Sequence, residues 1–153
     1  VVLSAISKIL SGGKSSLFES EIVDKKHLAS SISAYNMGLK DEGVFFIMAQ
    51  ALPNVKAQTI EKEIYAILER LKKGQISPQE LEKLKINTKA NFIYGFEDAS
   101  SSAYVFGDYL ARGDLSPLFA YEEAIGDLSI ERIAQVARKY FDNKQLSVVI
   151  LRK

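Results

Sequence analysis

The clearest alternation of hydrophobic and polar positions runs from residue 28 to residue 52. One side of its first part carries Leu28, Ser30, Ile32 and Ala34, and the other Ser31, Ser33 and Tyr35. This period of two predicts a strand with one buried face. The polar segment Gly38–Gly43 has a glycine at each end, which is typical of a turn. Val44–Met48 is apolar on both faces, so we expect a second strand that is central and covered, ended by Pro53.

Most of the remaining chain has the apolar spacing of amphipathic helices. Helices are predicted at 1–10, 17–23, 54–73, 78–92 and 98–111, with shorter ones beginning at Ser116 and Ser129. The apolar side predicted for 98–111 consists of Tyr104, Val105, Phe106 and Leu110. Ser77-Pro78-Gln79-Glu80 is a capping box with proline at the first helical position. The apolar segment Leu146–Leu151 predicts a final strand, which must lie at the sheet centre or be covered.

This order of elements predicts a two-layer α+β domain, with helices packed on one face of a mainly antiparallel sheet. No internal repeat or linker divides the chain, so residues 1–153 are expected to form a single domain. The formal net charge of +1 gives no basic excess for nucleic acid. No apolar run approaches the roughly 18 residues of a membrane span. The chain contains no cysteine, which excludes a thiolate metal site and leaves the cellular compartment open.

Two short motifs suggest chemistry, and neither is complete. Gly13-Lys14-Ser15 has the end of a phosphate-binding loop, but Lys8 stands where the first glycine belongs, and a helix instead of a strand precedes it. We therefore expect a loop that ends a helix. His27 is the single histidine, whereas a zinc site takes three or four ligands. A surface histidine at the entrance to a strand is the expected reading. A nucleophilic triad would have only His27 as its imidazole base, and the chain has no Gly-x-Ser-x-Gly elbow.

Several segments in order resemble the second domain of the pitrilysin/insulinase family of zinc metallopeptidases, which includes mitochondrial processing peptidase. The matching segments are Ile9–Ser16, Leu28-Ala29, Asp41–Phe45, Ser129–Phe141 and Gln145–Ile150. The resemblance implies the LuxS/processing-peptidase-like metallohydrolase fold. In that family the domain begins with a strand before its first helix, and here this strand would lie upstream of Val1. We therefore expect an excised fragment that lacks its first strand and the upstream zinc-binding domain.

The resemblance also implies where chemistry is missing. The family's zinc motif, His-x-x-Glu-His, belongs to the first domain. Some second domains add an arginine and a tyrosine to the active site, and these positions fall at Val23 and Ser30 here. Valine cannot make a bidentate charged contact and serine lacks the reach of a phenol, so neither is expected to replace the family residue. We expect no catalytic residue and no metal ligand in this chain.

The resemblance thus implies the non-catalytic C-terminal domain of a zinc-dependent metalloendopeptidase subunit, with zinc bound elsewhere in the parent enzyme. Such a domain would form part of the substrate chamber and pack against the zinc-bearing N-terminal domain or a partner subunit. Peptide substrate would bind in the assembled enzyme. The alternative is a domain of a degenerate, catalytically inactive partner or structural subunit of the same family. A third hypothesis is an unrelated ligand-binding α+β domain.

Overall fold

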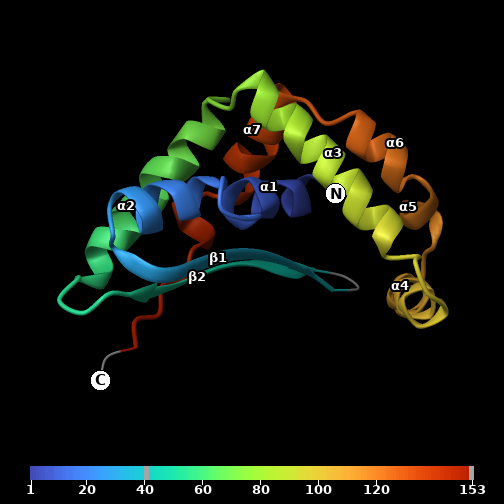
Figure 1. Ribbon diagram of the computed structural model, residues 1–153, viewed down its shortest axis with the longest axis horizontal. Helices are drawn as coiled ribbons and strands as arrows, with labels where there is room; N and C mark the ends of the chain where they lie inside the picture. Colours follow the sequence, from blue (N-terminus) through green and yellow to red (C-terminus); the bar gives the residue numbers. More distant parts are fainter. Residues whose placement is uncertain (40–41, 152–153) are drawn as a thin grey trace.

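An antiparallel hairpin lies under a layer of helices in the computed structural model, which describes residues 1–39 and 42–151 (Figure 1). Lys40 and Asp41 of the predicted turn lie outside the described residues. The elements are α1 (Val2–Ser11), the π-helix η1 (Glu19–Lys25), β1 (Ala29–Gly38), β2 (Gly43–Ala51), α2 (Ala57–Lys72), α3 (Pro78–Tyr94), α4 (Ala99–Ala111), α5 (Ser116–Phe119), α6 (Tyr121–Gly126), α7 (Ile130–Tyr140) and the 3-10 turn η2 (Asn143–Gln145). This architecture confirms the predicted α+β class.

The predicted hairpin is present, with β1 and β2 paired from Ala29↔Ala51 to Gly38↔Gly43. A bulge between Ala29 and Ser31 adds one residue to β1 at its start. Alternate residues face the helices, and Ile32 is buried there as the period of two requires. The hairpin therefore has a helix-facing side and an outer side.

Helix α1 is fastened to β1 by side-chain hydrogen bonds. The Ala34 amide donates to Ser11 Oγ at 2.8 Å, near the end of the helix. At its start, Asn36 Nδ2 donates to Ser4 Oγ at 3.2 Å. Because Asn36 pairs with Phe45 near the hairpin turn, α1 begins at the turn end of the hairpin.

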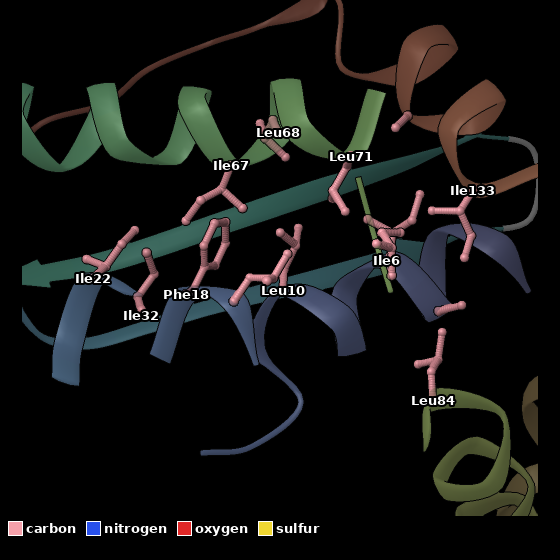
Figure 2. Packing of buried hydrophobic residues seen from close by; sticks show 14 of the residues in the cluster. Ile6, Leu10, Phe18, Ile22, Ile32, Ile67, Leu68, Leu71, Leu84 and Ile133 are labelled. Carbon is pink, nitrogen blue, oxygen red and sulfur yellow. The ribbon is translucent and has the colours of Figure 1, made fainter. Parts of the chain in front are cut away.

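Helices α1, α2 and α7 and the η1 region bury one continuous core above the hairpin (Figure 2). The largest fully buried side chains are Phe18, Ile6, Leu10, Ile22, Ile67, Leu71 and Ile133. These positions repeat at helical spacing, so local sequence already marks them as one face of each helix. Burial of these side chains is the main contribution to the stability of this fold.

The helix starts predicted at Ser77 and Ser129 are confirmed by their hydrogen bonds. The Glu80 amide donates to Ser77 Oγ at 3.1 Å and the Ser77 amide donates to Glu80 Oε2 at 2.7 Å, which completes the capping box of α3. The Arg132 amide donates to Ser129 Oγ at 3.1 Å at the start of α7. These bonds are local, so they follow directly from the sequence.

The prediction of a final, covered strand at Leu146–Leu151 is wrong for the described residues. This segment forms no strand, and Leu151 is 93% exposed. The sheet of the described residues contains β1 and β2 alone, so the segment has no neighbouring strand with which to form a ladder. An apolar segment needs such a neighbour before it can be buried as a strand.

The prediction that Val44–Met48 is central and covered is also wrong for the described residues. Phe45 and Ile47 pack against the core, but Val44, Phe46 and Met48 are exposed on the outer side of the hairpin. No described element covers that side, and the helices lie on the other one (Figure 1). The apolar pattern therefore correctly marked a two-sided strand, while the chain described supplies cover for one side.

The apolar side predicted for 98–111 is likewise not buried. Helix α4 forms as expected, with Asp98 as its N-cap, but none of its residues is buried and Tyr104 is 81% exposed. The helix touches the rest of the domain through the Phe106 ring, whose centre lies 6.0 Å from that of Phe96. The N-cap of α4 is local, but a helix of 13 residues is marginal in water without packing, so its exposed apolar side is a surface that favours cover.

Candidate functional site

The described residues offer no metal centre. Within residues 1–39 and 42–151, no group of three or more His, Cys, Asp or Glu side chains could hold an ion. His27 is exposed and precedes β1, which agrees with the expected surface histidine at a strand entrance. Its backbone has φ of +48°, and its amide donates to the Val23 carbonyl at 3.2 Å. The side chains present therefore do not fit a zinc ion.

The backbone of His27 leads to a testable prediction. A residue with a Cβ pays roughly 1–2 kcal/mol in the left-handed region, while glycine adopts it freely. We expect His27→Gly to raise the free energy of unfolding by about 0.5–1 kcal/mol, after the entropy cost of glycine is subtracted. Urea unfolding followed by circular dichroism measures this change. His27→Ala is the control and should give no gain, and a loss of stability in His27→Gly would contradict the prediction.

The glycine-rich segment after α1 is a helix-ending loop, as predicted. Gly13 has φ of +124°, a backbone conformation that favours glycine. Lys83 Nζ of α3 donates to Ser15 Oγ at 2.6 Å, and Ser16 is buried. This hydrogen bond fastens the loop at the end of α1 to helix α3.

Val23 and Ser30 have different surroundings. Val23 lies in η1 and packs partly buried against the core. Ser30 lies at the bulge of β1, is exposed, and donates from its hydroxyl to the Gln50 carbonyl at 3.2 Å. Bulges re-aim a side chain away from the regular ladder, and π-helical turns such as η1 are frequent at functional sites. That neither residue replaces the family's arginine and tyrosine stays a prediction.

The segment η1 is held against α2 by two ion pairs. Arg70 Nη1 lies 2.6 Å from Glu21 Oε1, and Lys26 pairs with Glu63. Both pairs are partly exposed, so each contributes little to overall stability. Their effect is positional, because they tie the turn that contains Val23 to the long helix.

The outer side of the hairpin carries a continuous apolar surface, which we call the outer face. It consists of Tyr35, Met37, Val44, Phe46 and Met48. Met37 pairs with Val44, and Tyr35 pairs with Phe46, so the side chains lie in adjacent rows across the two strands. Neither β1 nor β2 contains a charged residue, although 25% of the whole chain is charged. Exposed apolar surface depleted in charge marks an interaction site.

The second open feature is the outer edge of β2. Beyond this edge a hollow of about 410 Å³ is lined by Ala51, Val55, Lys56, Ala57, Gln58, Ile150 and Leu151. The hollow lies at the Ala51 end of β2. At the other end of this strand, the Phe141 ring meets the Phe45 ring edge-on, with ring centres 5.0 Å apart. The segment from Phe141 to Leu151 therefore follows β2 in the same direction without pairing to it. Edge strands of natural proteins are usually blocked by lysine or proline, and β2 contains neither.

Helix α4 is the third exposed apolar feature, close to the hairpin turn. A side chain built at Gly38 would meet Arg112 Nη1 at 3.1 Å, so the end of α4 lies beside the end of β1. Hydrogen bonds from the Ser101 side chain and amide lower the pKa of the Asp98 carboxyl at its start. Partial burial raises the pKa of the Tyr109 phenol. The Asp98 carboxylate caps the start of α4, and Tyr104 and Leu110 are exposed.

These features define a two-layer α+β domain whose two strands carry no charged residue and, in the part of the chain described, no grouping of metal ligands. Residues 1–88 match the family model described as the peptidase M16 inactive domain. This match covers more than half of the 153 residues, and the chain therefore belongs to that family. Membership confirms the predicted resemblance to the second domain of zinc metallopeptidases. That this chain contributes no zinc ligand stays a prediction.

Individual relatives agree with this assignment. The chain is 47% identical over 152 residues, 99% of its length, to zinc protease PqqE of Helicobacter pylori (strain ATCC 700392 / 26695), and spans 34% of that protein. The crystal structure of a protease from Helicobacter pylori has a TM-score of 0.91 at 48% identity, covering 94% of this chain and 35% of that one. The peptidase M16 inactive domain from Pseudomonas fluorescens shares the fold at 20% identity, with a TM-score of 0.77 and coverage of 92% and 33%. The chain thus spans about a third of the length of these relatives.

Sequence reasoning missed the outer face as a candidate site. Its signal was available, because the segments Leu28–Leu39 and Gly43–Val55 contain no charged residue. A strand that is apolar on both faces was expected to be buried, so its outer side was not considered as a surface.

None of the described helices is long and apolar enough to span a membrane.

Proposed function

We propose that this chain is the non-catalytic C-terminal domain of a zinc-dependent metalloendopeptidase. It packs against the zinc-bearing domain and forms part of the wall of the substrate chamber. One observation carries the proposal: the two strands of the hairpin contain no charged residue, and among the described residues they are open on the outer face and on the outer edge of β2. A surface of this composition is costly to leave in water, so it needs a partner in the working protein.

The open edge supports a polypeptide that extends beyond the chain described. Zinc protease PqqE is about three times longer, and a strand from additional sequence of this kind would fit between β2 and the segment 146–151. Its N–H and C=O groups would pair with both neighbours, and the exposed apolar residues of that segment would then be covered. We propose that the missing strand precedes α1 and that the zinc-binding domain lies further upstream.

The direction of the chain is consistent with this strand. Segment 141–151 follows β2 in the same direction, so one strand between them can run antiparallel to both. Such a strand ends beside Phe45, at the turn end of the hairpin. Helix α1 begins at that end, because Ser4 there accepts a hydrogen bond from Asn36. A short connection therefore suffices to join the strand to α1.

Helix α4 is the proposed contact with the zinc-bearing domain. It has one acidic residue, Asp108, which pairs with Arg112 at 2.7 Å. The exposed Tyr104 and Leu110 supply the kind of side chains that dominate domain interfaces. The contact is proposed for the same polypeptide or for a partner subunit of the same family.

Metal analysis tests the proposed function. We expect the full-length protein to contain one zinc ion and to cleave peptides, with cleavage lost on chelation and restored by added zinc. The chain of residues 1–153 should contain no stoichiometric zinc and cleave nothing. Plasma emission spectrometry measures the metal, and a quenched fluorescent peptide measures the cleavage. Stoichiometric zinc in this chain alone, or peptidase activity from it, would contradict the proposal.

A second candidate is a degenerate subunit without peptidase activity. Val23 and Ser30, which the resemblance places where some second domains carry an arginine and a tyrosine, favour it. The upstream sequence separates the two candidates, because an intact His-x-x-Glu-His motif supports an enzyme. A full-length protein that folds but holds no zinc would support the degenerate subunit.

A further inference from the structure

We propose that η1 is a conformational switch held by charge. The ion pairs Glu21–Arg70 and Lys26–Glu63, which we call the clamp, keep this segment π-helical, and the segment shifts to an α-helix when the clamp is lost. Neither zinc nor cleavage enters this proposal, which goes beyond the proposed function. The change is confined to the part of the chain between α1 and β1.

The two clamp residues of η1 are five positions apart, which is the repeat of a π-helix. The Lys26 amide donates to the Glu21 carbonyl at 3.2 Å, a bond of the π-helical type. Both side chains therefore lie on one side of η1 and reach α2. In an α-helix each residue advances by about 100°, so positions five apart point about 140° away from each other. An α-helical segment would present Glu21 or Lys26 to α2, but not both.

The partners on α2 form a matching row. Glu63 and Arg70 are seven positions apart, close to two full turns of an α-helix, so they lie on the same side of α2. Arg70 Nη1 lies 2.6 Å from Glu21 Oε1, and Lys26 pairs with Glu63. Opposite charges thus meet at both ends of the row. The row on α2 therefore selects the form of η1 in which both charged side chains face it.

The connection after η1 can take up the residue that an α-helix would release. A π-helical turn contains one residue more than an α-helical turn, so the shift passes one residue towards β1. His27 in this connection has φ of +48°, which is unfavourable for a residue with a Cβ. A longer connection allows His27 to leave this conformation. The strain at His27 thus acts against the clamp.

The buried contacts of η1 limit how far the change extends. Phe18 and Ile22 are fully buried and four positions apart, so they share one face of an α-helix as well. These two anchors to the core are therefore kept in both forms. Val23, where some second domains carry an arginine, follows them in η1 and turns with the shift. The clamp thus determines the direction of this position.

The test uses the full-length protein and removes charge while it keeps the shape of the side chains. Glu21→Gln and Glu63→Gln are combined in one variant, which removes both acidic partners of the clamp. Glu69→Gln is the matched control, because Glu69 pairs with Lys72 at 2.7 Å within α2. Hydrogen–deuterium exchange followed by mass spectrometry reports on residues 19–31 and on α2. Crystal structures of wild type and variant show the helical form of η1.

We expect residues 19–31 of the double variant to exchange roughly tenfold faster than in wild type at low salt, which is the scale on which two partly exposed pairs act. Its structure should show α-helical bonds at Lys26. Raising the ionic strength from about 0.02 M to about 0.5 M should bring wild type towards the variant, because salt screens exposed charges. Lys26→Glu combined with Glu63→Lys should restore the exchange of wild type, and Glu69→Gln should not differ from it.

Other results overturn the proposal. Equal exchange of residues 19–31 in wild type and double variant, with π-helical bonds in both structures, shows that packing alone holds η1. Faster exchange in a variant whose structure stays π-helical shows local opening without a second helical form. A similar rise in α2 and in residues 19–31 reports a loss of overall stability and also contradicts the switch. A wild-type protein without zinc or cleavage overturns the proposed function alone.

Discussion

Phe18→Ala is expected to lower the free energy of unfolding by about 3–5 kcal/mol, which is the usual range for deleting a buried aromatic ring. Phe18 has no exposed surface and lies among Leu10, Ile22 and Ile67 at the centre of the core (Figure 2). Alanine would leave a cavity bordered by helices that are already packed against one another, so collapse into the space is limited. This loss is a large fraction of the 5–15 kcal/mol typical of a folded domain.

Urea unfolding of wild type and variant measures this difference. Phe119→Ala is the matched control, because it deletes the same ring from a position that is 73% exposed. Its effect should stay within about 0.5 kcal/mol, as for most surface substitutions. Similar losses for the two variants would show that the core is not centred on Phe18.

The second large effect concerns the open edge of β2. In the full-length protein, we expect alternate amides of β2 and amides of the segment 147–151 to exchange with solvent on the order of 100-fold more slowly than in the chain of residues 1–153. The reason is that the proposed upstream strand would accept hydrogen bonds from groups that face solvent at this edge. Hydrogen–deuterium exchange followed by mass spectrometry measures the rates.

Helix α2 provides the internal control for this comparison. Its amides are bonded within the helix in both proteins, so their exchange reports the change in overall stability. The ratio of β2 to α2 exchange then isolates the effect at the edge. An equal ratio in the two proteins would contradict a strand beside β2.

The local elements of this protein are determined by its sequence. The alternation from Leu28 to Tyr35 and the glycines of Gly38–Gly43 predicted the hairpin that forms. The capping box at Ser77 and the cap at Ser129 predicted where α3 and α7 begin. Each of these features depends on bonds between residues close in sequence, so a short window contains the necessary information. The ordered motifs shared with the pitrilysin/insulinase family were also sufficient to predict the family.

Tertiary structure decided what each apolar surface faces. The sequence marked Val44–Met48, Leu146–Leu151 and the apolar side of α4 as surfaces to be covered, yet the described chain leaves much of all three exposed. Apolar composition determines that burial is favourable, but it does not name the partner, because the hydrophobic effect has no direction. The partner depends on contacts between distant segments. For the outer face and the edge of β2, only the three-dimensional arrangement of hairpin, helices and final segment showed that no described helix or strand covers them.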